Sequence, residues 1–213
     1  MNSASIPRAV WLLTLGCWLG STGCTGLKPV AVFERHFVLS PSPLQAMPSE
    51  LLRSATPPSL GIGPVRIPSY LSRDSFAVRR GANEISYLET VRWAERLDRG
   101  GQRVLAANLG ALLPTMVLRS SSWASGEVGA VVQVRLDRFD IDTDGVGVLE
   151  AEWSVAQPGD ERLLRSGQSR HRLQGPPPSV DPDGAVGTLN GLLGRLSEEL
   201  ARALTSPEHP TPD

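Results

Sequence analysis

Aliphatic and polar residues alternate along two stretches in the second half of the chain. Every second residue is aliphatic or alanine in 130–137, and the same period holds in 149–155, where Trp153 takes one apolar position. A period of two predicts β-strands that each bury one face. A turn at 157–160 leads into a weaker strand signal at 163–173. These stretches predict strands joined by tight connections.

Two other stretches repeat their apolar residues every three or four positions, which predicts amphipathic helices. The first covers 101–113, and Pro114 ends it because proline cannot continue a helix. The second begins near Asp183, and we expect its apolar stripe to pack into the core. The residues of this stripe are Val186, Leu189, Leu193, Leu196, Leu200 and Leu204.

The first half of the chain contains shorter signals. Runs rich in aliphatic and aromatic residues predict strands at 35–39, 60–68 and 76–80. Residues 86–93 fit either an extended or a helical segment. Residues 40–59 are rich in serine and proline, which predicts a surface loop.

Two prolines punctuate the strand predicted at 60–68. Proline has no N–H to donate to a sheet, so Pro64 fits an edge strand or a bulge better than a central position. We interpret Pro64 and Pro68 as marking an edge, which would leave backbone groups free for a partner.

The order of these elements predicts one α/β domain. Strands, a helix, strand hairpins and a final helix form a mixed β-sheet packed against amphipathic helices, as a two-layer or three-layer sandwich. We place this domain at 34–205 and expect the proline-containing tail, 206–213, to be disordered.

The first 23 residues have the features of an export signal. Arg8 precedes an apolar run at 9–19, and small residues then lead to Cys24. The run is shorter than the roughly 20 residues that a spanning helix needs. The end of the segment resembles a bacterial lipobox, whose cysteine receives lipid. We therefore expect a lipoprotein signal peptide at 1–23, lipid on Cys24 and a tether at 24–33.

Two alternatives to this anchor remain open. Cys17 is preceded by Thr14-Leu15-Gly16 and could be the lipid acceptor instead, although its apolar run would then be short. The chain could also be secreted without lipid. Thr25, rather than aspartate, follows Cys24, which favours the outer membrane over the inner membrane.

The cysteine count and the net charge limit the possible functions further. The 213 residues contain only two cysteines, both in or directly after the signal, so no disulfide is expected in the domain. The net charge of −1 becomes −2 once Arg8 leaves with the signal. This balance gives no electrostatic basis for binding nucleic acid.

One acidic segment superficially matches a calcium loop. Asp140-Ile141-Asp142-Thr143-Asp144-Gly145 has the first half of an EF-hand loop, but Ala151 stands where the bidentate glutamate is required. A strand end followed by an Asp-Gly turn explains the same residues. We therefore expect a hairpin turn and no calcium.

The chain shows no other pattern that carries chemistry. The three histidines lie in unrelated segments, so we expect no metal and no cofactor; they are His36, His171 and His209. We find no spacing typical of a hydrolase nucleophile. The sequence therefore favours a binding role over an enzyme.

Several segments, read in order, resemble the PqiC-like ABC-type transport auxiliary lipoprotein family. The most specific is Trp93-Ala94-Glu95 with its downstream helix, although Arg96 stands where the family pattern has proline. The matching segments are Arg35–Leu39, Gly61–Arg73, Phe76–Arg80, Arg92–Leu97 and Arg103–Leu109.

The resemblance implies an accessory protein without catalytic residues. It implies a domain that is lipid-anchored in the outer membrane, faces the periplasm and works with an MCE-domain protein in intermembrane lipid transport. A homo-oligomer is compatible with this role. The alternative is an outer-membrane lipoprotein that activates a peptidoglycan synthase or binds the cell wall.

Three residues are candidates for binding the partner: Tyr70, Arg73 and Trp93. Tyr70 and Arg73 lie in the turn after the predicted edge strand. Trp93 has two interpretations, since it could anchor a partner or pack between the sheet and the helix at 101–113. The pair Arg79-Arg80 is interpreted as a solvated strand end, and an anionic lipid head group is the alternative ligand.

Overall fold

A computed structural model describes residues 33–48, 57–124, 126–158 and 163–206. Contacts divide the chain into Met1–Phe33 and Glu34–Asp213, and the helices and strands of the described residues lie in the second unit. The predicted signal peptide, Cys17, Cys24 and most of the predicted tether lie outside the described residues, as does nearly all of the predicted tail. No helix in the described ranges has both the length and the apolar character needed to span a membrane.

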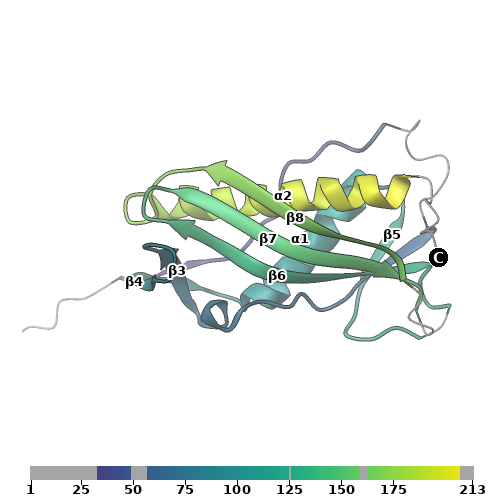
Figure 1. Ribbon diagram of the computed structural model, residues 1–213, viewed down its shortest axis with the longest axis horizontal. Coiled ribbons are helices and arrows are strands. Elements are labelled where there is room, and N and C mark those ends of the chain that lie inside the picture. The colour runs from purple at the N-terminus through teal and green to yellow at the C-terminus, as the bar shows by residue number, and fades with distance from the viewer. Residues whose placement is uncertain (1–32, 49–56, 125, 159–162, 207–213) are drawn as a thin grey trace, which may run out of the picture. The chain divides into compact units, whose positions relative to one another are not determined.

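The described residues of the second unit form eight strands, one short 3₁₀ helix and two α-helices (Figure 1). In chain order they are β1 (Arg35–Phe37), β2 (Ser59–Ile62), η1 (Ser69–Leu71), β3 (Ser75–Arg79), β4 (Ile85–Trp93), α1 (Leu97–Leu112), β5 (Met116–Arg119), β6 (Ala130–Asp142), β7 (Val146–Ala156), β8 (Leu163–Gln174) and α2 (Pro182–Thr205). The α/β class expected from the sequence is confirmed.

Strand β6 is the centre of a mixed sheet. One of its sides pairs antiparallel with β7, which pairs antiparallel with β8. The other side pairs in parallel with β2 near the start of β6 and with β3 near its end. Beyond β2 lies β5, and beyond β3 lie β4 and β1. The long β6 therefore joins the groups of strands on its two sides into one sheet.

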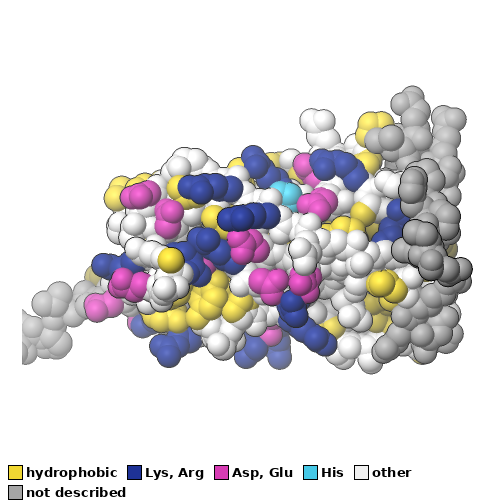
Figure 2. Space-filling view, in the orientation of Figure 1, with side chains coloured by type: hydrophobic (Ala, Val, Ile, Leu, Met, Phe, Trp, Pro, Cys, Tyr) yellow, Lys and Arg dark blue, Asp and Glu magenta, His cyan; other side chains and the backbone are white. Residues whose placement is uncertain are grey.

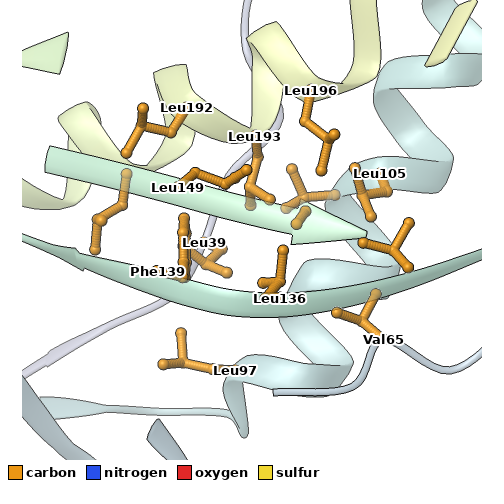
Figure 3. Packing of buried hydrophobic residues seen from close by; sticks show 14 of the residues in the cluster. Leu39, Val65, Leu97, Leu105, Leu136, Phe139, Leu149, Leu192, Leu193 and Leu196 are labelled. Atoms are coloured by element: carbon orange, nitrogen blue, oxygen red, sulfur yellow. The ribbon is translucent and has the colours of Figure 1, made fainter. Parts of the chain in front are cut away.

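Both α-helices pack on the same face of this sheet, so the sandwich has two layers. In Figure 3, Leu192, Leu193 and Leu196 of α2 lie over Leu149 of β7. The six residues of the predicted stripe are each at most 4% exposed, which confirms their place in the core. Burying a leucine side chain stabilises a fold by about 1.5–3 kcal/mol, so this stripe fixes α2 on the sheet.

The start of α2 follows from local chemistry. Asp181 caps the helix, because its Oδ1 accepts a hydrogen bond of 3.0 Å from the backbone N–H of Gly184. Pro182 occupies the first helical position, where no N–H partner is needed.

Several elements differ from those expected. Helix α1 begins at Leu97 rather than 101, because Gly100 and Gly101 dilute the apolar pattern in its first turns. Strand β6 continues to Asp142, beyond the regular alternation. Strand β5, which is only four residues long, was not predicted at all. The ambiguous segment at 86–93 forms most of β4.

Strand β2 itself is not an edge, because it lies between β5 and β6; Pro64 and Pro68 come after its end at Ile62, where the described backbone pairs with β6 alone. Ile62 is opposite Val132, whereas Arg66 is opposite Arg135. Four residue steps on one chain thus match three on the other, which places a bulge next to Pro64. The bulge that the sequence offered as an alternative is therefore present where the chain continues along β6.

Candidate functional site

The turn that carries Tyr70 and Arg73 is a single turn of 3₁₀ helix. The backbone N–H of Leu71 donates to the carbonyl of Pro68 at 3.0 Å, and that of Ser72 donates to Ser69 at 3.1 Å. Leu71 is 4% exposed and holds the turn against the core. Tyr70 is consequently half-buried and Arg73 is exposed.

Tyr70 belongs to a cluster around the buried carboxylate of Asp140, whose side chain is 0% exposed. The Tyr70 hydroxyl donates to Oδ2 of Asp140 at 2.9 Å. Arg79 Nη2 donates to the same oxygen at 2.7 Å, and Arg138 Nε donates to Oδ1 at 2.9 Å. We call these four side chains the Asp140 cluster; it joins η1 and β3 to β6.

This cluster changes the reading of Arg79-Arg80. The Arg79 side chain is only 17% exposed and is bound to Asp140, so it is not a solvated strand end. Arg80 is exposed and donates to the hydroxyl of Ser86 at 3.0 Å.

The environment of Tyr70 affects its ionisation. Burial, followed by the negative charge of Asp140, raises the pKa of Tyr70 from 10.0 to about 12. The hydroxyl therefore stays protonated at neutral pH and remains a hydrogen-bond donor to Asp140. Tyr70 thus helps to hold the turn in place.

Arg73 lies next to Tyr70 on the surface. Its guanidinium carbon is 5.0 Å from the ring centroid of Tyr87, which is a cation–π distance. The Tyr87 hydroxyl in turn donates to the backbone carbonyl of Tyr70 at 3.1 Å. The structure therefore brings Tyr70 and Arg73 together, with only Arg73 fully exposed.

Trp93 is buried at the end of β4, with 6% of its surface exposed. Its ring stacks on Phe76 of β3, with centroids 5.3 Å apart and planes inclined by 22°. Trp93 is therefore a core residue that packs on β3, and its packing against the helix at 101–113 stays a prediction. A role in binding a partner stays a prediction.

Sequence reasoning gave no role to two polar groups that tie the first part of the domain to α1. Arg103 contacts Glu95 and donates to the backbone carbonyl of Leu39 at 2.7 Å. Asn108, which is 1% exposed, accepts from the backbone N–H of Ser42 at 3.1 Å and donates to Ser197 Oγ of α2 at 3.1 Å. The signal available in the sequence is an asparagine on an otherwise apolar helix face.

The acidic segment at 140–145 forms the predicted turn between β6 and β7. Asp142 Oδ1 accepts from the backbone N–H groups of Asp144 and Val146, at 3.0 and 2.8 Å. Gly145 has φ of +84°, a conformation that glycine adopts without strain. Asp140, the first residue of the calcium-like motif, is engaged by the two arginines and Tyr70 instead.

Two of the three histidines lie in the described ranges, and each is near a glutamate. His36 Nε2 is 3.8 Å from Glu34 and His171 Nε2 is 2.9 Å from Glu199. Over these same ranges no three residues of the metal-binding types gather in one place.

An open hollow of about 640 Å³ lies on the helix-free face of the sheet. Its polar lining includes Gln133, Arg135, Glu152, Ser166 and Gln168. Arg135 Nη2 donates to Glu152 Oε2 at 2.6 Å, so the opposite charges on the floor compensate each other. Figure 2 shows this mixture of Arg and acidic side chains over the face.

Comparison with protein families gives one extended match. A family model described as the ABC-type transport auxiliary lipoprotein component matches residues 37–201. No curated protein matches the sequence.

Two solved structures share the fold. A crystal structure of an uncharacterized protein is 21% identical, with a TM-score of 0.61 over 80% of this chain and 98% of that chain. Protein XCC0632 from Xanthomonas campestris, assigned to family DUF330, is 12% identical, with a TM-score of 0.62 over 80% of this chain and 95% of that chain. At these identities the likeness extends to the fold alone.

Proposed function

We propose that this chain, which belongs to the family of ABC-type transport auxiliary lipoproteins, is a non-catalytic periplasmic component of a lipid transport system. In this proposal, lipid on Cys24 anchors the chain in the outer membrane, and the folded domain binds an MCE-domain protein. The observation that carries the proposal is the family match over 37–201, which spans nearly all of the described fold.

The contact surface we propose centres on Arg73. Its guanidinium is exposed, and stacking on Tyr87 limits its motion, so binding a partner costs little side-chain entropy. Arginine is also frequent among the residues that dominate interface energies. Tyr70 supports this surface through the Asp140 cluster, and Trp93 fixes the end of the β4 strand that carries Tyr87.

Affinity purification of the tagged full-length chain from cross-linked cell envelopes tests the partner. We expect an MCE-domain protein to co-purify with the wild type and to be largely lost with Arg73→Glu. Arg99→Glu, a charge reversal of an exposed arginine on α1, is the matched control and should retain the partner. Recovery of a peptidoglycan synthase in place of an MCE-domain protein would contradict the proposal.

The anchor has its own test. Cys24→Ala should accumulate as an uncleaved precursor that takes up no labelled palmitate, because the thiol that accepts the lipid is absent. Cys17→Ala is the control and should be processed normally. Processing and labelling of the Cys24→Ala variant would instead identify Cys17 as the lipid acceptor.

A further inference from the structure

Three strands lie at the outer edges of the described sheet, and they differ greatly in length. Strand β1 has three residues and β5 has four, whereas β8 has twelve. Each pairs on one side only within the described ranges. Short edge strands are one of the ways in which proteins avoid pairing with other chains. Strand β8 does not use this protection.

Two further protections, proline and a β-bulge, are also missing from most of β8. Leu163–Gln174 contains no proline, and its pairing with β7 is one-to-one from Arg165 to Gln174. One feature closes the far end of the edge: Arg195 Nη1 donates to the carbonyl of Arg172 at 3.1 Å. The stretch from Arg165 to His171 is thus a regular edge with no such cover among the described residues.

The charge of β8 has a single sign. The strand holds three arginines and one histidine but no carboxylate. Arg170 pairs with Glu150 of β7 at 3.2 Å, yet its side chain is still 77% exposed, and Arg172 is exposed too. Figure 2 shows dark-blue Arg side chains, with magenta acidic side chains between them, over the part of the face where β7 and β8 run in Figure 1.

We propose that β8 is a docking strand, which pairs through its free edge with an extended segment of a partner protein that carries carboxylates at alternate positions. Alternate side chains of an added strand lie on one face of the sheet, where they reach Arg170 and Arg172. A second copy of this chain fits less well, because two β8 strands would bring six arginines together without a carboxylate on either strand. The proposal depends neither on Cys24 nor on the Arg73 surface.

The test uses the chain from Thr25 onward, which keeps every buried core residue from Leu39 to Leu204. The probe is an acetylated and amidated ten-residue peptide of alternating glutamate and valine; the same peptide with lysine for glutamate is its control. We expect the glutamate peptide to bind and to slow hydrogen exchange of amides between Arg165 and His171. The lysine peptide should not bind.

Charge-reversal variants distinguish docking of the peptide at β8 from nonspecific electrostatic attraction to the protein. Arg170→Glu and Arg172→Glu should each weaken binding of the glutamate peptide by about tenfold or more, which corresponds to 1.4 kcal/mol. Arg202→Glu, at a 64% exposed position on α2, should leave it unchanged. Both β8 positions are exposed, and the Arg195 contact uses the backbone of Arg172, so these variants retain the fold.

Three outcomes would overturn the proposal. The first is no binding of the glutamate peptide to the wild type. The second is protection from exchange elsewhere than on β8. The third is self-association of the wild type through β8, seen by sedimentation and abolished by Arg170→Glu, which would identify the occupant as a second copy.

Discussion

Asp140 accepts hydrogen bonds from two guanidinium groups and one tyrosine hydroxyl, although its side chain has no exposed surface. Bonding of this kind offsets the cost of taking a carboxylate out of water. The Arg79 and Arg138 side chains are only 17% and 24% exposed, so they depend on Asp140 as their counter-charge.

Replacing Asp140 by alanine should therefore be costly. We expect Asp140→Ala to lower the free energy of unfolding by about 3–5 kcal/mol, because it leaves two half-buried arginines without their partner. Urea unfolding followed by circular dichroism measures this. Asp137→Ala is the control: Asp137 pairs with Arg135 at 3.1 Å but is 47% exposed, so its loss should cost less than about 1 kcal/mol. Equal decreases of the free energy of unfolding in the two variants would contradict the role given to Asp140.

Tyr70 should give the fold a measurable sensitivity to alkali. Its pKa is raised from 10.0 to about 12 in the folded state, so between these pH values the unfolded chain loses this proton while the folded chain keeps it. Stability contributed by Tyr70 is thus complete below pH 10 and falls as the pH rises through 12.

The absorbance of the phenolate at alkaline pH reports this shift. The chain has two tyrosines, so Tyr87→Phe isolates Tyr70. We expect a titration midpoint of about 12 while circular dichroism shows the chain to be folded. A midpoint of 10 in the folded state would refute the proposed environment of Tyr70.

At the scale of elements, α2 contains glycines in two kinds of surroundings. A Cβ placed on Gly187 would meet no atom within 4 Å, whereas one placed on Gly194 would lie 2.7 Å from Ser42 Oγ. Glycine inside a helix is less favourable than alanine by about 0.5–1 kcal/mol, since it loses more backbone freedom on folding.

Gly187→Ala should accordingly stabilise the protein by about 0.5–1 kcal/mol. Gly194→Ala is the matched variant on the same helix and should bring no gain, because Ser42 must move to admit the methyl group. Thermal melts of both variants give the comparison. A gain for Gly194→Ala as large as that for Gly187→Ala would contradict the packing of Ser42 on α2.

The elements that sequence patterns identify are those whose periodicity covers several turns or pleats. The leucines of α2 and the alternation in β6 and β7 are of this kind, and they lie in the core as predicted. Strand β5 was not predicted because its four residues are too few to show an alternating pattern. The surroundings of Pro64 show a second limit: the neighbours of a strand, and the residues at which they end, cannot be predicted from the strand's own residues.

Only part of the proposed contact surface could be predicted from the sequence. Arg73 follows Tyr70 by three residues, so the turn alone brings them together. The bond between Tyr70 and Asp140 joins positions 70 residues apart, and it exists only once β6 lies beside β3. The same holds for Asn108, which joins Ser42 to Ser197.

At the scale of the whole molecule, β6 holds the two groups of strands in one sheet over one core. Trp93 lies on β4, on one side of β6, and Trp153 lies on β7, on the other. Because the two regions share β6 and its core, we expect them to unfold in one cooperative transition.

Variants of the chain from Thr25 onward that retain only one of these tryptophans test this expectation. Fluorescence of Trp93 and of Trp153 should give the same urea midpoint, and circular dichroism should coincide with both. Phenylalanine replaces the other tryptophans, Trp123 included, since it keeps much of the ring volume. Separate midpoints would mean that β6 does not couple the two groups of strands.

The attachment of residues 39–42 to α1 has a mechanical consequence for a protein anchored as proposed. Tension from an N-terminal anchor reaches β1 first, and β1 holds to β4 through only three residue pairs. Further along the chain, Arg103 donates to the carbonyl of Leu39, and Asn108 accepts from the backbone N–H of Ser42. Both side chains belong to helix α1. Under load, strand β1 would separate from β4 first and lengthen the tether, and the bonds from α1 to residues 39–42 would carry the pull next.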